Sequence, residues 1–470
     1  MSYLKERKIV TREKRIFSLS HFNGTAEQLA GEIQGDIKQR QRTFMQINRD
    51  EVIKAVQVLS SIQDVAVIVH GVAGCSASGL GFSLSGNGGV YSTNLEERDT
   101  ILGSDEKLRD AVTKAYREKH PSAIFIVSTP VVAINNDDIN SVILELEDEL
   151  NLPIISVYTD GFKTKTAETG SDIVLHGLLK YLVQTSENDE LGEDYAAEKT
   201  NAPLVNVVSV TESKADVEVV SKLLQDIGIQ ANVLPRFASV KDIKAAKNAA
   251  ATVVLNTDEG LYFAQELETS FSVPFIRTAS PIGDHSTESF VLAVARALGL
   301  EEKAAEILQK ERAAFEKRTV EKPLSGKTVF LEAFAGHLTE YSQIVTSLGG
   351  TVEAVALPSV DTENRAVIQR LAKQHPLLPI IVGNGQQFEK ANELSKKHFD
   401  YYVSENGQVA FASEYGTIPI SLKGLKHYGY SGAAEIASAF TNAVSYQFEQ
   451  VYTQSWLKRS GSWFVKQEVN

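Results

Sequence analysis

The amino-acid sequence predicts an α/β protein of three tandem, doubly wound, Rossmann-like domains, each with a parallel sheet. The first observation is that short apolar runs of strand length alternate with amphipathic runs of helical length along nearly the whole chain. This alternation is typical of parallel sheets covered by helices. The second is that it restarts twice, after an acidic stretch and after a proline. The third is the length of 470 residues, which favours roughly two to four domains.

The first domain is predicted at residues 1–190. Its buried strands are expected at 64–70, 123–128 and 154–158, and its helices at 105–118, 137–150 and 170–185. A Gly-rich loop at 79–89 follows the first of these strands. The segment 186–201 is rich in Glu, Asp and Asn and lacks an apolar face, so we interpret it as a domain boundary.

The second domain is predicted at 201–322 and the third at 323–470, because Pro323 breaks the chain after a long charged helix at 301–318. Second-domain strands are expected at 205–210, 230–234 and 252–256, with helices at 215–227 and 240–249. Third-domain strands are expected at 327–330, 352–356, 378–382 and 401–403, followed by a C-terminal helix. In open sheets of this kind, ligands bind in crevices beyond the carboxyl ends of the strands.

The composition excludes several classes of function. The formal net charge of -13 argues against nucleic-acid binding, because neutralising phosphates requires a basic face. The short basic segment 5–15 is interpreted as a solvated arm. No stretch approaches the length that spans a membrane, and the start of the chain lacks the apolar region of a signal peptide, so we expect a cytoplasmic protein. The single cysteine also rules out an intrachain disulfide framework.

That cysteine stands in the most informative motif of the chain, His70-Gly71-Val72-Ala73-Gly74-Cys75. The motif follows a β-branched strand, so its turn delivers the thiol to the end of a sheet. A thiolate binds iron strongly, and the two glycines would let the backbone approach an iron–sulfur cluster closely. One thiol cannot hold a four-thiolate cluster, so a cluster here requires ligands from another chain. The simpler interpretation is a buried free cysteine.

The region around Cys75 resembles the cluster-binding turn of nitrogenase component 1 proteins. That family includes the nitrogenase MoFe protein subunits, cofactor-assembly scaffolds, and the protochlorophyllide and chlorophyllide reductases. Further segments resemble its motifs in the same order: TNLEERD at 93–99, ST at 128–129 through DDI at 137–139, GFK at 161–163, VNVV at 205–208, PF at 274–275 with PIG at 281–283, and HYGYSG at 427–432. The resemblance covers about residues 45–440 and implies three domains around a central cavity.

Several residues depart from the family pattern. The family's third cluster cysteine falls on Pro130, and the segment 44–48 that should carry the first has none. The histidine that binds the cofactor of MoFe nitrogenase would fall nearest Tyr428, with His427 one place away. The cysteine that binds the other end of that cofactor has no counterpart at 256–262. We therefore expect no iron–molybdenum cofactor in this chain.

Three ligand arrangements are left open for Cys75. A homodimer would supply two Cys75 thiolates and need two more ligands, for which His70, Gln46, Asn48 and water are candidates. A heterodimer with a paralogous three-cysteine component 1 subunit would supply four thiolates, three from the paralogue and one from Cys75. We favour this arrangement. In the third arrangement no cluster binds. His70 is otherwise a hydrogen-bonded core histidine.

The resemblance implies one subunit of an ATP-dependent iron–sulfur oxidoreductase that receives electrons from an iron-protein partner. ATP is expected on that partner, because Ser325-Gly326-Lys327-Thr328 lacks the first glycine of a nucleotide loop and precedes a strand. Electrons would pass through the interface cluster to a small-molecule substrate or a metallocofactor. One alternative is a metallocofactor-assembly scaffold or non-catalytic partner subunit. Another is a cytoplasmic protein that binds a small molecule or metal complex.

Five residues are candidates for lining the crevice where the three domains meet: Arg277, Gly283, His285, His427 and Tyr428. Arg277 could pair with a carboxylate substrate, and the histidines could donate protons near neutral pH. Gly283 lies in a loop that resembles one facing the cofactor cavity of the family. Arg277, the two histidines and Tyr428 are also compatible with surface or structural roles.

Overall fold

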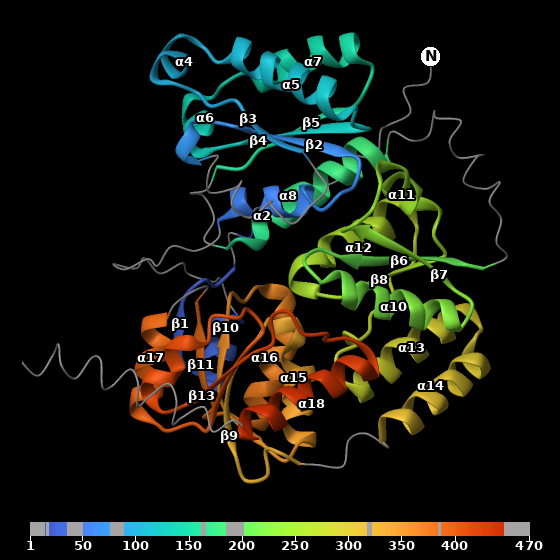
Figure 1. Ribbon diagram of the computed structural model, residues 1–470, viewed down its shortest axis with the longest axis vertical. Coiled ribbons are helices and arrows are strands. Elements are labelled where there is room, and N and C mark those ends of the chain that lie inside the picture. The colour runs from blue at the N-terminus through green and yellow to red at the C-terminus, as the bar shows by residue number, and fades with distance from the viewer. Residues whose placement is uncertain are drawn as a thin grey trace, which may run out of the picture.

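The computed structural model describes residues 15, 18–34, 50–75, 89–160, 166–184, 202–316, 322–383 and 387–445. Several features expected from the sequence lie outside these residues: nearly all of the loop 79–89, the boundary 186–201, the motif 161–163 and the candidate ligands Gln46 and Asn48. Within the described part of the chain, three mainly parallel sheets covered by helices confirm the predicted α/β class (Figure 1).

The first domain contains a four-stranded parallel sheet in the order β3-β2-β4-β5. Its strands are β2 (Val65–His70), β3 (Gly89–Ser92), β4 (Ala123–Ser128) and β5 (Ile154–Val157). Because side chains alternate along a strand, the two faces of this sheet contribute to two separate cores. One core is closed by α2 (Glu51–Leu59) and α8 (Glu168–Leu178), and the other by α5 (Asp105–Lys119), α6 (Pro130–Asn135) and α7 (Ile139–Leu150).

The second domain contains a three-stranded parallel sheet in the order β7-β6-β8. Its strands are β6 (Leu204–Ser209), β7 (Gln230–Pro235) and β8 (Ala251–Val254). Its helices are α10 (Lys214–Asp226), α11 (Val240–Lys244), α12 (Thr257–Phe271), α13 (Asp284–Leu298) and α14 (Glu301–Glu316). Val207 joins a core shared with the third domain, whereas Val208 joins the core shared with the first. The second sheet therefore packs against both of its neighbours.

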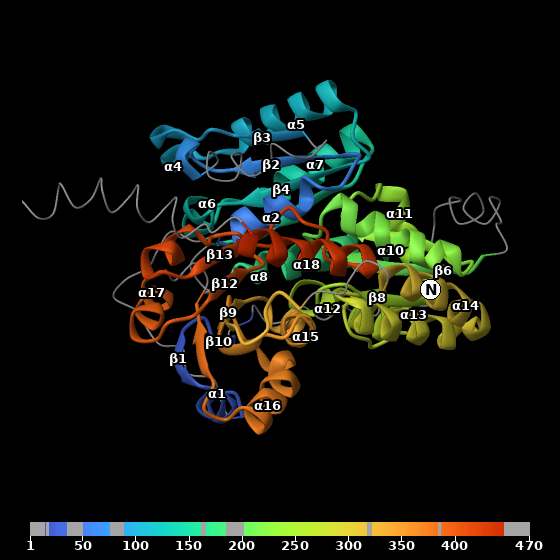
Figure 2. The same ribbon diagram turned by 60° about the horizontal axis from the view of Figure 1, so that its bottom comes forward.

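The third domain contains a six-stranded sheet in the order β1-β11-β10-β9-β12-β13. Its parallel strands are β9 (Thr328–Glu332), β10 (Thr351–Leu357), β11 (Pro379–Val382), β12 (Tyr401–Ser404) and β13 (Ile418–Ser421). Its main helices are α15 (Leu338–Ser347), α16 (Arg365–Gln374), α17 (Gln387–Lys396) and α18 (Gly429–Ser445). Helix α18 reaches across to α10, α13 and α14 of the second domain (Figure 2).

Residues 18–34 lie on the third domain, although the sequence placed residues 1–190 in the first. Strand β1 (Phe22–Thr25) pairs antiparallel with β11 (Figure 1), and helix α1 (Ala26–Glu32) packs against α16 (Figure 2). Arg15, expected in a solvated arm, is only 6% exposed. The described residues 18–34 thus lie on the third domain, whereas the described residues 50–75 belong to the first.

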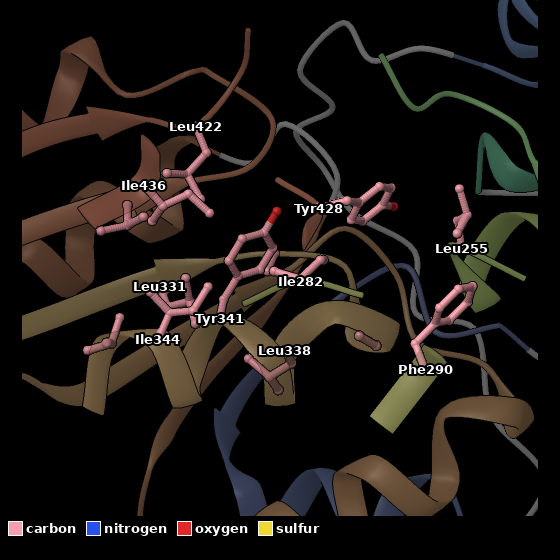
Figure 3. Packing of buried hydrophobic residues seen from close by; sticks show 14 of the residues in the cluster. Leu255, Ile282, Phe290, Leu331, Leu338, Tyr341, Ile344, Leu422, Tyr428 and Ile436 are labelled. Carbon is pink, nitrogen blue, oxygen red and sulfur yellow. The ribbon is translucent and has the colours of Figure 1, made fainter. Parts of the chain in front are cut away.

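The largest core joins the second and third domains. Leu255 and Phe290 of the second domain belong to the same cluster as Leu331, Tyr341 and Ile436 of the third (Figure 3). Burying apolar surface contributes about 25 cal/mol per Å² to the free energy of folding, so this shared core stabilises the contact between the two domains.

No helix in the described ranges is both long and apolar enough to cross a bilayer.

Candidate functional site

Cys75 lies in a helical turn that starts at Ala73, just after the carboxyl end of β2. The last residue of β2, His70, pairs with Ser128 at the end of β4. Val72 then forms a bridge with Leu95. Cys75 is free of any disulfide and partly exposed. The strand therefore delivers the thiol to the surface of the first domain, beside the carboxyl ends of two neighbouring strands.

The two glycines of this turn have different surroundings. A Cβ atom at Gly71 would overlap the side chain of Thr129, which follows β4. The Thr129 hydroxyl donates to the His70 carbonyl at 2.9 Å, so only glycine lets the ends of β2 and β4 approach this closely. Among the described residues, a Cβ at Gly74 would meet no atom within 4 Å. Gly71 is thus required by packing, whereas no described neighbour requires glycine at position 74.

His70 is a buried core histidine in this structure. Its Nδ1 lies 3.1 Å from the Thr93 hydroxyl and its Nε2 lies 3.2 Å from the Ser104 hydroxyl. Burial lowers the pKa of His70 to about 4, although Asp137 nearby acts in the opposite direction. Both ring nitrogens are occupied within the protein, so His70 holds the turn in place and does not present a nitrogen to a metal.

The described residues supply Cys75 alone as a sulfur ligand. Among them, no three His, Cys, Asp or Glu side chains are arranged so that they could hold a metal ion. Pro130, which the sequence resemblance places at the family's third cysteine, begins α6. Cys75 therefore fits an iron–sulfur cluster as one thiolate ligand, provided that the remaining ligands come from elsewhere.

His427 is partly buried, Tyr428 is buried, and hydrogen bonds tie both residues into the protein. The Tyr341 hydroxyl lies 2.5 Å from His427 Nδ1, and His427 Nε2 lies 2.9 Å from the Leu422 carbonyl. The backbone N–H groups of 427 and 428 both donate to Asp216, at 2.6 and 3.3 Å. Tyr428 is 2% exposed (Figure 3). These contacts fasten the start of α18 to α10.

The structure places the other three candidates, Arg277, Gly283 and His285, in three different local environments. Arg277 donates to Glu268 at 2.8 Å, stacks on Phe275, and lines a pocket of about 200 Å³ with Val254, Thr257, Leu261, Gln265, Phe275, Ile276, Thr278 and Glu363. Gly283 has a φ of 82° and begins α13, where its conformation favours glycine. His285 is exposed in the first turn of that helix. The pocket beside Arg277 is not lined by His285, His427 or Tyr428.

A buried charged cluster, absent from the sequence-based candidates, lies at the carboxyl ends of β6 and β8. Lys54 of α2 forms an ion pair with Glu259 in the first turn of α12. The other Glu259 oxygen accepts from the Thr211 hydroxyl. Glu212 accepts from the Ser209 hydroxyl at 2.7 Å, and burial together with Glu259 raises the pKa of Glu212. The cluster thus joins the first and second domains by charge at the place where open sheets bind ligands.

His337 extends this charged region into the third domain. Its Nδ1 lies 2.7 Å from a Glu405 carboxylate oxygen, and its Nε2 lies 3.0 Å from the Leu255 carbonyl. Both partners are acceptors, so both ring nitrogens carry protons. Burial alone would lower the pKa of His337, but the Glu405 carboxylate beside it raises the pKa to about 10. His337 is therefore a buried cation that links the second and third domains.

The sequence does hint at this charged cluster, because three of its acidic residues follow buried strands. Glu212 follows β6, Glu405 follows β12, and Glu259 stands in the first turn after β8. Acidic residues that follow buried strands fall at the ligand-binding edge of an open sheet. They are more simply interpreted as helix caps or solvated residues, which is why sequence reasoning passed over them.

Comparison with known proteins decides the family. Residues 51–445 match the family model described as nitrogenase component 1 type oxidoreductase. The chain belongs to this family. A solved structure described as nitrogenase Cp1 at pH 5 has the same fold, with a TM-score of 0.74 over 90% of this chain and 94% of that chain at 20% identity.

Curated relatives of this component 1 type chain have several roles. It is 29% identical, over 54% of either chain, to the nitrogenase iron-molybdenum cofactor biosynthesis protein NifE of Clostridium pasteurianum. It is 25% identical to the NifE protein of a Nostoc species, over 86% of this chain and 84% of that one. It is 23% identical to a light-independent protochlorophyllide reductase subunit of Halorhodospira halophila, over 72% and 65%. The chain spans little more than half the length of the first of these relatives.

Proposed function

We propose that this chain is one subunit of a nitrogenase-like iron–sulfur oxidoreductase and supplies Cys75 as a single thiolate ligand of a cluster shared at a subunit interface. The observation that carries the proposal is the placement of Cys75, which is partly exposed at the end of β2. A cysteine kept for packing is most often buried, whereas a ligand shared between two chains must be accessible on each chain alone. The family of the chain supports the same interpretation.

The remaining ligands are proposed to come from a paralogous component 1 subunit, with a second copy of this chain as the other arrangement. His70 is withdrawn as a candidate ligand because both its ring nitrogens are hydrogen-bonded in the core. A bound cluster would accept and release single electrons, and an iron-protein partner that uses ATP would supply them. The residues of this chain would set the position of the thiol through the close contact of Gly71 with Thr129.

The site of an iron–molybdenum cofactor is not proposed in this chain. His427 is hydrogen-bonded through both ring nitrogens, and Tyr428 is buried. Asn256, at the start of the segment without a counterpart to the cofactor cysteine, caps α12 by accepting from the Asp258 N–H at 3.0 Å. These engaged side chains support the expectation that a substrate or metallocofactor, where one binds, is held by other groups.

Co-expression with the candidate partner tests the proposal. The chain and a three-cysteine component 1 paralogue from the same genome are purified together without oxygen, and iron and acid-labile sulfide are measured. Cys75→Ser is expected to remove most of both. Ala73→Ser is the matched control, because it adds a hydroxyl to an exposed position of the same turn and keeps the thiol. Equal iron and sulfide in wild-type and Cys75→Ser complexes would refute the proposal.

A metallocofactor-assembly scaffold is the second candidate function. This function is favoured by the similarity of the chain to several relatives that are named as cofactor biosynthesis proteins. A scaffold and a reductase subunit differ in the fate of what they bind. A scaffold would release its metal cluster to an acceptor protein within a single turnover, whereas a reductase would retain iron while it consumes ATP and reductant over many turnovers.

A further inference from the structure

The contacts of Arg15 join all three domains. Its guanidinium donates to the Asp172 carboxylate of the first domain through Nε at 2.7 Å and Nη2 at 3.1 Å. Nη2 also donates to the Asp258 backbone carbonyl of the second domain at 2.6 Å. Nη1 lies 3.4 Å from the Asp361 carboxylate of the third domain. One side chain thus touches the point where the three domains meet.

This position suits a guanidinium group in particular. Arg15 is 6% exposed, and a buried charge is costly unless it is paired and hydrogen-bonded. The two parallel bonds to Asp172 use the planar fork of the guanidinium, which an ammonium group lacks. The acceptors lie on different domains and surround the group. The Asp172 carboxylate, the Asp258 carbonyl and the Asp361 carboxylate therefore form a binding site, here called the cradle, whose charge and shape match a planar cation.

The walls of the cradle are held in place by contacts that do not involve Arg15. The Asp258 carboxylate accepts from the Gly336 N–H at 2.8 Å and from the Asn364 amide at 2.6 Å. The Asp361 carboxylate accepts from the Glu363 N–H at 2.8 Å. The second and third domains thus build their part of the cradle together, and Arg15 adds the link to Asp172 on the first domain.

Arg15 reaches the cradle from a segment that is anchored on the third domain. The Ser18 N–H donates to the Arg15 carbonyl at 2.9 Å. Leu19 and Val360 exchange two backbone hydrogen bonds of 2.6 and 3.0 Å, and β1 then continues along β11. A segment held on one domain therefore carries a side chain that binds the other two.

We propose that the three domains form a guanidinium-binding cradle, that the chain fills this cradle with its own Arg15, and that the N-terminal segment thereby straps the first domain to the other two. When Arg15 leaves, the carboxylates of the cradle lose their counter-ion and the seam between α8 and α12 loosens. The cradle is then open to a small guanidinium compound. The Lys54–Glu259 pair also crosses between the first and second domains, so the domains stay together when the strap is released.

Hydrogen exchange of Arg15→Ala tests this proposal. Amide exchange in the first turns of α8 and α12 is expected to become at least about tenfold faster than in the wild-type protein, because local opening there no longer breaks the Arg15 bonds to Asp172 and to the Asp258 carbonyl. Added methylguanidinium is expected to restore slow exchange, whereas methylammonium at the same concentration is not. Arg365→Ala is the matched control, since Arg365 binds the same N-terminal segment through the Ile33 carbonyl at 3.2 Å but within the third domain.

Two results would overturn the proposal. One is exchange in α8 and α12 that is no faster in Arg15→Ala than in Arg365→Ala. The other is equal rescue by the two cations, which would indicate a site for any small cation. Arg15→Lys keeps the positive charge but lacks the planar guanidinium group. This variant replaces Arg15→Ala in the experiment if Arg15→Ala does not fold. It is expected to show intermediate exchange that methylguanidinium does not slow, and exchange at the wild-type rate would contradict the role of the fork.

Discussion

Two buried histidines show how the partners of a single residue set its charge. The ring nitrogens of His70 meet two hydroxyl groups, and burial lowers its pKa to about 4, so His70 is neutral. The ring nitrogens of His337 meet a carboxylate and a backbone carbonyl, and its pKa is raised to about 10, so His337 is charged. Burial opposes the charge in both residues, and a carboxylate within hydrogen-bonding distance outweighs it in His337.

The ion pair of His337 predicts a loss of stability in Glu405→Gln. Removing one partner leaves a buried charge uncompensated, which typically costs about 3–5 kcal/mol. Because the folded pKa of His337 lies above its unfolded value of about 6.5, its stabilising contribution is complete below that value and is lost as pH rises through 10. Urea unfolding between pH 7 and 10 measures both effects. Glu414→Gln, at an exposed position of the same domain, is expected to keep the wild-type stability and its pH dependence.

His70 predicts the opposite pH dependence. Its folded pKa of about 4 lies below the unfolded value, so its contribution to stability is present above about pH 6.5 and is lost as pH falls toward 4. Thermal unfolding of the wild-type protein between pH 4 and 7 is expected to show this decline. His70→Asn, which does not titrate in this range, should be less stable at pH 7 and lose less stability on acidification. An equal decline in both proteins would contradict the neutral, buried state of His70.

At the scale of the element, the turn after β2 is shaped by one glycine and not by the other. Gly71 lies against Thr129 at the end of β4, whereas a Cβ at Gly74 would contact none of the residues that the structure describes. The difference matters for Cys75, because the contact at Gly71 determines where the turn leaves the sheet. The geometry of one strand end thus positions the only thiol of the chain.

Alanine substitution at the two glycines tests this difference. Gly71→Ala forces a methyl group into Thr129 and is expected to destabilise the protein by about 1–3 kcal/mol, the usual cost of overpacking. The methyl group of Gly74→Ala meets no atom of the described residues, so its effect on unfolding free energy is expected to stay within about 0.5 kcal/mol. Chemical denaturation of the two variants measures both values. Equal costs would show that the close approach of the two strand ends is not what requires Gly71.

Most sheet elements were predictable because they are buried apolar runs. The strands expected at 64–70, 123–128, 154–158 and 205–210 are confirmed as β2, β4, β5 and β6. Strand β3 was missed because its residues are only partly buried and its sequence has no apolar run. Strand β1 was not predicted, and its residues were placed in the first domain, because its pairing with β11 is a contact between distant parts of the chain, which local patterns do not report.

The candidate site was predictable in part for the same reason. The position of Cys75 at a strand end follows from the local pattern of β2 and its glycines. The partners of His70 and His427 come from segments far along the chain, and no local signal identifies them. Lys54, Glu259 and Arg15 were missed because a charged residue in a sequence is normally solvated, and only the packing of three domains buries these three.

At the scale of the whole molecule, buried charged groups cross every seam between the domains. Lys54 and Glu259 link the first domain to the second, His337 and the Leu255 carbonyl link the third to the second, and Arg15 links all three. Ion pairs of this kind contribute little net stability but specify which groups must meet. The relative placement of the domains is therefore specified by charge as well as by the shared apolar cores.

A double-mutant series on Lys54 and Glu259 tests this view. Lys54→Met leaves a buried carboxylate unpaired and is expected to cost about 3–5 kcal/mol, whereas Lys54→Met with Glu259→Met should recover most of that loss. Urea unfolding gives the free energies, and the cycle isolates the pair from its surroundings. Strictly additive costs would show that the two side chains do not depend on each other.

The accessibility of the single thiol tests the central claim most directly. Cys75 is the only cysteine of the chain, so labelling with a maleimide followed by mass measurement reports on this residue alone. We predict one label per chain in the isolated protein, none in the anaerobically assembled complex with its component 1 partner, and one again after chelation removes iron from the intact complex. Full labelling of Cys75 in the iron-loaded complex would contradict its role as a shared cluster ligand.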